Sequence, residues 1–178
     1  MRFLAKVKTV IGKIGEEKQS GFLYYFINLF VSIITGYNHE KYWKRREYCI
    51  NPARKNIFWK LYCLLYIKRV DAKHLSSFGT FYNSGCKFIS PPLLPHGPNG
   101  IIIGHDAVIG KDVKIFQQVT IAQGGVIIGD NVLLGAGSKI LSKVRIGNNC
   151  KIGANCVVVE DVPDGATVVL QKPRIIQK

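Results

Sequence analysis

The sequence predicts a mainly β protein in which an α-helical segment precedes a parallel β solenoid. Three observations lead to this prediction: a six-residue repeat fills the second half, glycines gather there, and aromatic and basic residues gather before it. Residues 1–75 hold 14 of the 19 aromatic and 15 of the 25 basic residues, whereas 14 of the 18 glycines follow. A change of composition on this scale marks a boundary between two architectures. We therefore divide the 178-residue chain into a segment at 1–75 and a domain at 76–178.

The first segment is expected to form helices with an unusual surface. Its apolar run at residues 22–35 is shorter than the roughly 20 residues that span a bilayer. A second run, at 57–67, mixes aliphatic and aromatic residues, and the segment carries a net charge of +10. Two interpretations stay open: a helical bundle packed on itself or on a sister subunit, or an interfacial helix at an anionic membrane surface. No nucleic-acid partner is expected, because no known reading module is present.

The chain is expected to be cytoplasmic, with a peripheral position at the inner face of the membrane as the extension of this prediction. The first 20 residues are basic but lack the continuous apolar core and cleavage site of a signal peptide. The five cysteines are an odd number and are scattered along the chain. This usage fits reduced thiols better than a disulfide framework.

The repeat begins at Ile103 and fixes the architecture of the second part. Ten hexads follow, with one extra residue placed at Ile127. The first residue of every hexad is Ile, Leu or Val, the second is Gly in six of the ten, and the fifth is small or β-branched. Cys150 and Cys156 occupy fifth positions and are expected in the core.

A period of six fits a short strand and a tight turn. The first and fifth residues would point inward, and the glycine would lie at the turn, where a positive φ or close backbone approach excludes a Cβ. Three such units close one triangular coil, and coils stack through parallel strands about 4.8 Å apart.

This repeat resembles that of the hexapeptide-repeat acyltransferases, over residues 80–178. The stretch LPHGPNGIIIG at 94–104 resembles the segment of serine O-acetyltransferases and related polysaccharide O-acetyltransferases in which a histidine precedes a glycine-led strand. The stretch IFQQVTIAQ at 115–123 resembles the coil that follows it. The resemblance implies a left-handed parallel β-helix, a homotrimer and acyl transfer.

By this resemblance His96 is the general base. A hydroxyl is a weak nucleophile at neutral pH, and an imidazole can take its proton as the oxygen attacks a thioester carbonyl. Acetyl-CoA would supply the thioester as co-substrate, so no metal is implied. Asn83 and Asn99 are candidates to bind the substrate or to orient His96.

The remaining histidines are weaker candidates. His105 stands at a third hexad position and is expected to face outward, with a subunit-interface contact near the cofactor as the alternative. His74 is expected at the surface of the helical segment. A metal site of the γ-carbonic-anhydrase type needs three histidines, and the β region holds two.

For acetyl-CoA, the resemblance implies a groove between neighbouring subunits, lined by small residues. The matching positions are Ala122, Ala136 and Ala154. Basic side chains that could pair with the nucleotide phosphates are Lys139, Lys172 and Arg174.

Two departures from the serine acetyltransferase pattern bear on the acceptor. Phe81 stands fifteen residues before His96, where the family carries an aspartate, and residues 123–125 replace a longer loop with a second histidine. We therefore predict an acetyl-CoA-dependent O-acetyltransferase acting on a sugar hydroxyl of a surface-polysaccharide precursor, which could be lipid-linked. The alternatives are a serine O-acetyltransferase of cysteine biosynthesis and a non-enzymatic hexapeptide scaffold.

Overall fold

The structure is a computed structural model that describes residues 27, 34–171 and 176. The chain divides into two compact units, Met1–Asn38 and His39–Lys178, and the elements below belong to the second. Most of the apolar run at 22–35 lies outside the described residues. The same holds for Lys172 and Arg174, two of the candidate phosphate-binding residues.

Within residues 39–171, two helices, α3 (His39–Ile50) and α4 (Ile57–Lys73), precede the strands. The side chain of Asn56 caps α4 by accepting a hydrogen bond from the Trp59 N–H at 3.0 Å. The predicted helical character of residues 57–67 is therefore confirmed. Neither described helix combines the length and the apolar character needed to cross a bilayer.

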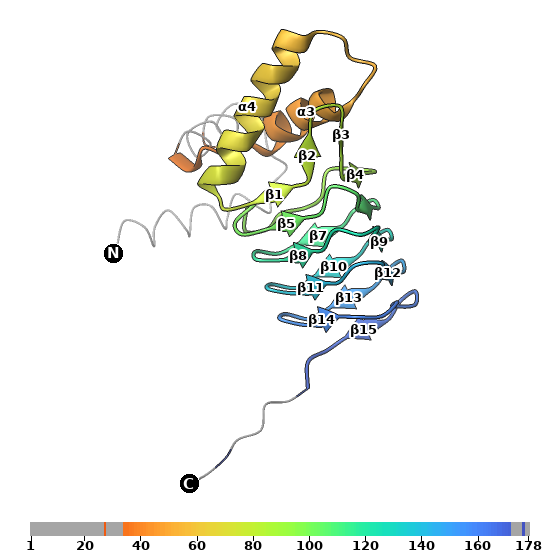
Figure 1. Cartoon of the computed structure of the whole chain (residues 1–178). Coiled ribbons are helices and arrows are strands. Elements are labelled where there is room, and N and C mark those ends of the chain that lie inside the picture. Colours follow the sequence, from red (N-terminus) through yellow and green to blue (C-terminus); the bar gives the residue numbers. More distant parts are fainter. Residues whose placement is uncertain (1–26, 28–33, 172–175, 177–178) are drawn as a thin grey trace, which may run out of the picture. The chain divides into compact units, whose positions relative to one another are not determined.

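A buried arginine attaches α3 to the first strands, which lie next to the helices in Figure 1. The Arg46 guanidinium donates hydrogen bonds to the carbonyls of Phe78 and Cys86 at 2.9 and 2.6 Å. It also lies over the rings of Trp43 and Phe88. A buried charge is tolerated when it has such partners, so these contacts hold the helices against the β region.

A second buried polar contact joins the two helices. The Tyr42 hydroxyl donates to the Asp71 carboxylate at 2.6 Å. Burial raises the pKa of Asp71 to about 6, although the hydrogen bond from Tyr42 opposes the rise.

The predicted parallel β-helix is confirmed, with three parallel sheets as its sides (Figure 1). The first sheet contains β1 (Ser77–Phe78), β5 (Ile102–Ile103), β8 (Thr120–Ile121), β11 (Lys139–Ile140) and β14 (Val157–Val158). The second contains β4 (Lys87–Phe88), β6 (Val108–Ile109), β9 (Ile127–Ile128) and β12 (Arg145–Ile146). The third contains β7 (Lys114–Ile115), β10 (Leu133–Leu134), β13 (Lys151–Ile152) and β15 (Thr167–Val168). An antiparallel hairpin is formed by β2 (Thr80–Phe81) and β3 (Ser84–Gly85).

The strand register shows that three hexads make one coil. Ile102 pairs with Thr120, eighteen residues later, and Lys139 pairs with Val157 at the same separation. The first residues of the ten hexads are all at most 3% exposed. They form the continuous aliphatic column that the repeat predicts.

The extra residue lies earlier than the sequence suggests. Val126 is fully buried and takes the inward position, whereas Gly125 is exposed with φ 77°. The insertion therefore belongs to the turn before Val126 and not to Ile127. The Asp106 carboxylate accepts hydrogen bonds from the N–H groups of Gly124 and Gly125 at 2.9 and 3.0 Å, which fixes this longer turn.

Crowding, and not positive φ, explains the glycine at second positions. A Cβ added to Gly135 would lie 2.7 Å from the Ala154 nitrogen and the Ile152 oxygen of the next coil. The positive φ angles fall two residues later in the hexad, for example 54° at Asn131 and 58° at Asn149. Asparagine is among the residues that enter this region most readily.

Candidate active site

One corner of the β-helix carries His96. It joins the third sheet to the first, and its turns lie at residues 94–101, 116–119, 135–138 and 153–156 in successive coils. Backbone hydrogen bonds stack these turns: the Gln118 N–H donates to the Asn99 carbonyl, and the Gly137 N–H donates to the Gln117 carbonyl, both at 3.0 Å. We call this edge the His96 corner.

A compact loop presents His96 at the helix-proximal end of this corner. The Gly97 N–H donates to the Leu94 carbonyl at 3.0 Å, which closes a turn around His96. Gly100 has φ 67°, and a Cβ there would lie 3.1 Å from the Gln118 side chain. The positive φ therefore favours glycine at position 100, and a Cβ there would also have to displace the Gln118 side chain slightly.

Asn99 ties the loop to α4. Its side-chain nitrogen donates to the His96 carbonyl at 3.0 Å, and its side-chain oxygen lies 2.9 Å from His74 Nδ1. The Gly100 N–H adds a hydrogen bond to the His74 carbonyl at 2.9 Å. His74 caps the C-terminal end of α4 and is half-buried, in contrast to the surface position expected from the sequence. The loop is thus held at its base while His96 itself stays exposed.

The His96 ring lies edge-on to Phe116 of the next coil, with 5.5 Å between ring centroids. Among the described residues, no side chain or backbone group is hydrogen-bonded to either of its ring nitrogens. The ring is therefore positioned by an apolar contact and keeps both nitrogens for another molecule.

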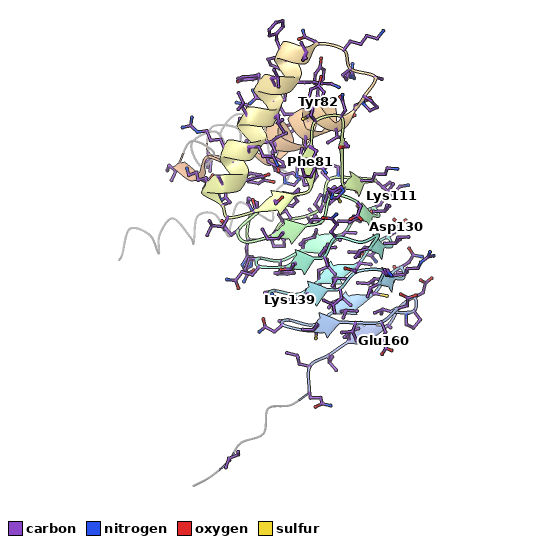
Figure 2. All side chains as sticks on the ribbon, viewed as in Figure 1. Phe81, Tyr82, Lys111, Asp130, Lys139 and Glu160 are labelled. Atoms are coloured by element: carbon purple, nitrogen blue, oxygen red, sulfur yellow. The ribbon has the colours of Figure 1, made fainter. Side chains whose placement is uncertain are left out.

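The candidate cofactor residues separate into two places. Ala136 and Ala154 lie on the His96 corner, one and two coils beyond Phe116, and their backbones are stacked through the hydrogen bond from the Asn155 N–H to the Ala136 carbonyl at 2.8 Å. Ala122 lies on a different corner, which joins the first sheet to the second. Lys139 is exposed on β11, three residues after Ala136 (Figure 2).

Asn83 lies apart from His96. Its side-chain oxygen accepts a hydrogen bond from the buried ammonium of Lys60, and its backbone N–H donates to the Cys49 carbonyl at 3.1 Å. These contacts join the β2–β3 turn to the helices. Of the two candidate asparagines, the structure brings only Asn99 to the His96 loop.

Phe81, the residue in place of the family's aspartate, belongs to β2 next to the helices (Figure 2). Its ring lies edge-on to His105, 5.5 Å away between centroids. The sequence predicts that His105 faces outward. In the structure it is half-buried, because the Phe81 ring covers part of it.

A cavity of about 280 Å³ lies beside the His96 loop, between the end of α4 and the corner. Its polar lining comes from Lys73, His74, Asn99, Gln117 and Gln118. Gln117 is also notable because its side-chain oxygen is buried without a hydrogen-bond partner among the described residues. None of the lining residues is acidic.

The thiols do not compete as nucleophiles. All five cysteines are free and buried, and the core position expected of Cys150 and Cys156 is confirmed. Burial raises the pKa of Cys86 to about 12 and raises those of Cys49 and Cys63. Because the thiolate is the reactive form, these residues serve packing.

Sequence reasoning missed Phe116, Gln117 and His74. Phe116 gave a usable signal, because it stands at a second hexad position where six of the ten hexads have glycine. Gln117 and His74 gave none, since their roles depend on how α4 meets the corner.

Two family models match the repeat region. One, described as bacterial transferase hexapeptide (six repeats), matches residues 125–160, and the other, hexapeptide repeat of succinyl-transferase, matches residues 100–142. No curated protein matches the chain.

Solved structures of serine acetyltransferases share the fold. Isoform 3 from Entamoeba histolytica, in complex with cysteine, has 30% identity over 66% of this chain and 43% of its own, with a TM-score of 0.56. The soybean enzyme complexed with serine has 27% identity over 84% of this chain and 57% of its own, with a TM-score of 0.54. A serine acetyltransferase in complex with CoA has 31% identity over 63% and 46%, with a TM-score of 0.52.

This chain therefore spans about half the length of these enzymes. The resemblance to hexapeptide-repeat acyltransferases, seen first in the repeat, is confirmed.

Proposed function

We propose that this chain, which resembles the hexapeptide-repeat acyltransferases, is an acetyl-CoA-dependent O-acetyltransferase with His96 as general base. The observation that carries the proposal is the His96 corner itself. An exposed imidazole stands at one end of a column of turns that continues through Ala136 and Ala154. The small side chains leave room for an extended thioester along this edge, and the base lies at the end of that edge.

His96 would remove the proton from the acceptor hydroxyl as its oxygen attacks the thioester carbonyl. The imidazolium then returns that proton to the leaving sulfur, so the base is regenerated. A ring nitrogen without a protein partner is what this exchange requires. Phe116 and the Asn99 tether would limit the positions that the ring can adopt, which favours a productive orientation.

Ala136 and Ala154 would let the pantetheine arm approach the backbone of the corner. Lys139, exposed nearby on β11, would pair with the nucleotide phosphates, as would Lys172 and Arg174. One of the solved relatives is a complex with CoA, which supports CoA as the carrier.

A homotrimer would complete this groove. In a closed ring of identical subunits the contacting surfaces are two different patches. Ala122, on another corner, would then line the groove from the neighbouring subunit.

We propose the cavity beside the His96 loop as the acceptor site, and a sugar hydroxyl as the acceptor. The amides of Gln117 and Gln118 can both donate and accept hydrogen bonds, as a polyol requires. Asn99, by contrast, is held by His96 and His74. No acidic residue lines the cavity to pair with the ammonium group of an amino acid. L-serine remains the second candidate, because solved relatives are complexed with serine or cysteine.

The parts of the chain take different roles in this proposal. Residues 76–178 would be the transferase, and residues 1–75 would contact a sister subunit or an anionic membrane surface. An acceptor held at a membrane would explain why a cytoplasmic transferase carries such a basic segment.

The acceptor is tested by measuring CoA thiol release from acetyl-CoA with L-serine in one reaction and UDP-N-acetylglucosamine in another. The proposal expects release with the nucleotide sugar, and loss of that release in Gln117→Leu. Release with serine alone would assign the chain to the second candidate. A chain that does not bind CoA in calorimetry would instead be a scaffold.

A further inference from the structure

We propose that one face of α4 docks the protein on an anionic membrane surface. This face, called the α4 face, consists of Phe58, Leu61 and Leu65 with Lys68 and Arg69 beside them. The docking claim stands independently of the enzyme activity.

The exposed side of α4 is unusually apolar, because a surface helix ordinarily presents polar residues to solvent. Phe58 is 82% exposed and Leu65 is 70% exposed. The opposite side is already packed, and it buries Cys63, Ile67 and Val70 together with Lys60 and Asp71. A further apolar line that faces outward on such a helix indicates a partner for the outward side.

The spacing makes the α4 face continuous. Phe58, Leu61 and Leu65 follow one another at intervals of three and four residues, so they form one line along the helix. Lys68 and Arg69 follow Leu65 by three and four residues and therefore flank the line on its two sides. The Lys68 ammonium lies 5.3 Å from the centroid of the Phe81 ring, at one edge of the line. The long stem of Arg69 can lie along an apolar surface while its charged group reaches past it.

The charges select a lipid surface over a second copy of the chain. The one acidic residue of α4 is Asp71, which is 4% exposed, so the exposed side of the helix carries cations only. Arg45 of the neighbouring helix α3 has its guanidinium carbon 4.9 Å from the centroid of the Tyr62 ring. This pair adds a cation and an aromatic ring beside the α4 face. The whole chain has a formal charge of +14, so two such faces repel each other, whereas anionic lipid attracts them.

Docking in this way would bring the His96 loop to the membrane. The helix ends at His74, which holds Asn99 and Gly100 of that loop. With a rise of about 1.5 Å per residue, His74 lies about 14 Å along the helix from Leu65. This last step rests on the proposed function: a lipid-linked acceptor would meet the base at the end of the docked helix.

The test is flotation of the full chain with vesicles of phosphatidylcholine, with and without phosphatidylglycerol. We expect binding only to the anionic vesicles, with release at high salt. Leu65→Ser should weaken binding about tenfold, and the double variant Lys68→Gln/Arg69→Gln about thirtyfold at low salt. Val159→Ser is the matched control, because Val159 is 66% exposed on the β-helix and its loss should change nothing.

The two proposals can fail separately. His96→Ala should float like the wild-type chain even if it has lost activity. Vesicle binding that is unchanged in both α4 variants, with far-UV circular dichroism also unchanged, would overturn the docking proposal. So would a fall in oligomer mass in Leu65→Ser without loss of vesicle binding, because the α4 face would then be an interface between copies.

Discussion

Replacing Asn99 should impair catalysis while replacing Asn83 should impair folding. Asn99→Ala removes the hydrogen bond to the His96 carbonyl and the one to His74. Each hydrogen bond contributes about 1 kcal/mol, so the loop that positions His96 loses about 2 kcal/mol of stabilising free energy. If that loss falls on the transition state, kcat/KM decreases roughly thirtyfold.

Asn83→Ala is the matched control. Lys60 is 1% exposed, and the change leaves its ammonium with the Asn51 carbonyl, at 2.7 Å, as the remaining hydrogen-bond acceptor in the described part of the chain. It also places alanine at φ 60°. Losing a hydrogen bond to a buried charge costs about 1.5–3 kcal/mol, and the backbone strain adds about 1 kcal/mol. The melting temperature should fall by about 6–12 °C.

The assay is steady-state acetyl transfer for both variants, with melting followed by circular dichroism. We expect Asn99→Ala to lose activity even well below its melting temperature, and Asn83→Ala to melt earlier but to keep a near-normal kcat at low temperature. Asn99→Asp keeps an acceptor for His74 but loses the donor to His96, and should behave like Asn99→Ala. Normal activity in Asn99→Ala would refute the positioning role.

Three further predictions concern stability and assembly. Gly135→Ala should destabilise the β-helix by about 1–3 kcal/mol in chemical unfolding, because the new Cβ meets backbone 2.7 Å away; an unchanged midpoint would contradict the crowding argument. Asp71→Asn should stabilise the chain by on the order of 3 kcal/mol above pH 6 and by nothing below pH 4. The pKa of this buried carboxyl rises from 3.8 to about 6, so the folded protein binds the proton more tightly, and the cost of ionising Asp71 in the folded state grows as pH rises through that window. Equal stabilisation at both pH values would contradict this explanation. Light scattering should give three times 19.9 kDa, or six times for a dimer of trimers, and a monomer would remove the shared groove.

The β-helix could be predicted almost residue by residue because its repeat is local. Each hexad carries its own inward aliphatic residue, so Ile103 or Ile152 can be placed without knowing what packs elsewhere. The extra residue was placed wrongly at Ile127 because an aliphatic residue there fits the pattern as well as Val126 does. Only the burial of Val126 and the exposure of Gly125 separate the two registers.

The candidate site was predictable only where it follows a motif. His96 belongs to the stretch at 94–104, Ala136 and Ala154 stand at the third position of their hexads, and the fold brings all three to one corner. The contacts of Asn99 and His74 depend on the packing of α4 against that corner, which no local pattern encodes. Asn83 and Asn99 looked equivalent in sequence, yet a buried lysine engages one and the His96 loop engages the other.

The central claim is that acyl transfer occurs at the His96 corner through the imidazole. The most direct measurement is CoA thiol release from acetyl-CoA by wild type, His96→Ala and His105→Ala with the same acceptor, alongside calorimetric binding of CoA. The account predicts a loss of about a hundredfold to ten-thousandfold in His96→Ala, unchanged CoA affinity, and activity within a few-fold of wild type in His105→Ala. Full turnover in His96→Ala would contradict it.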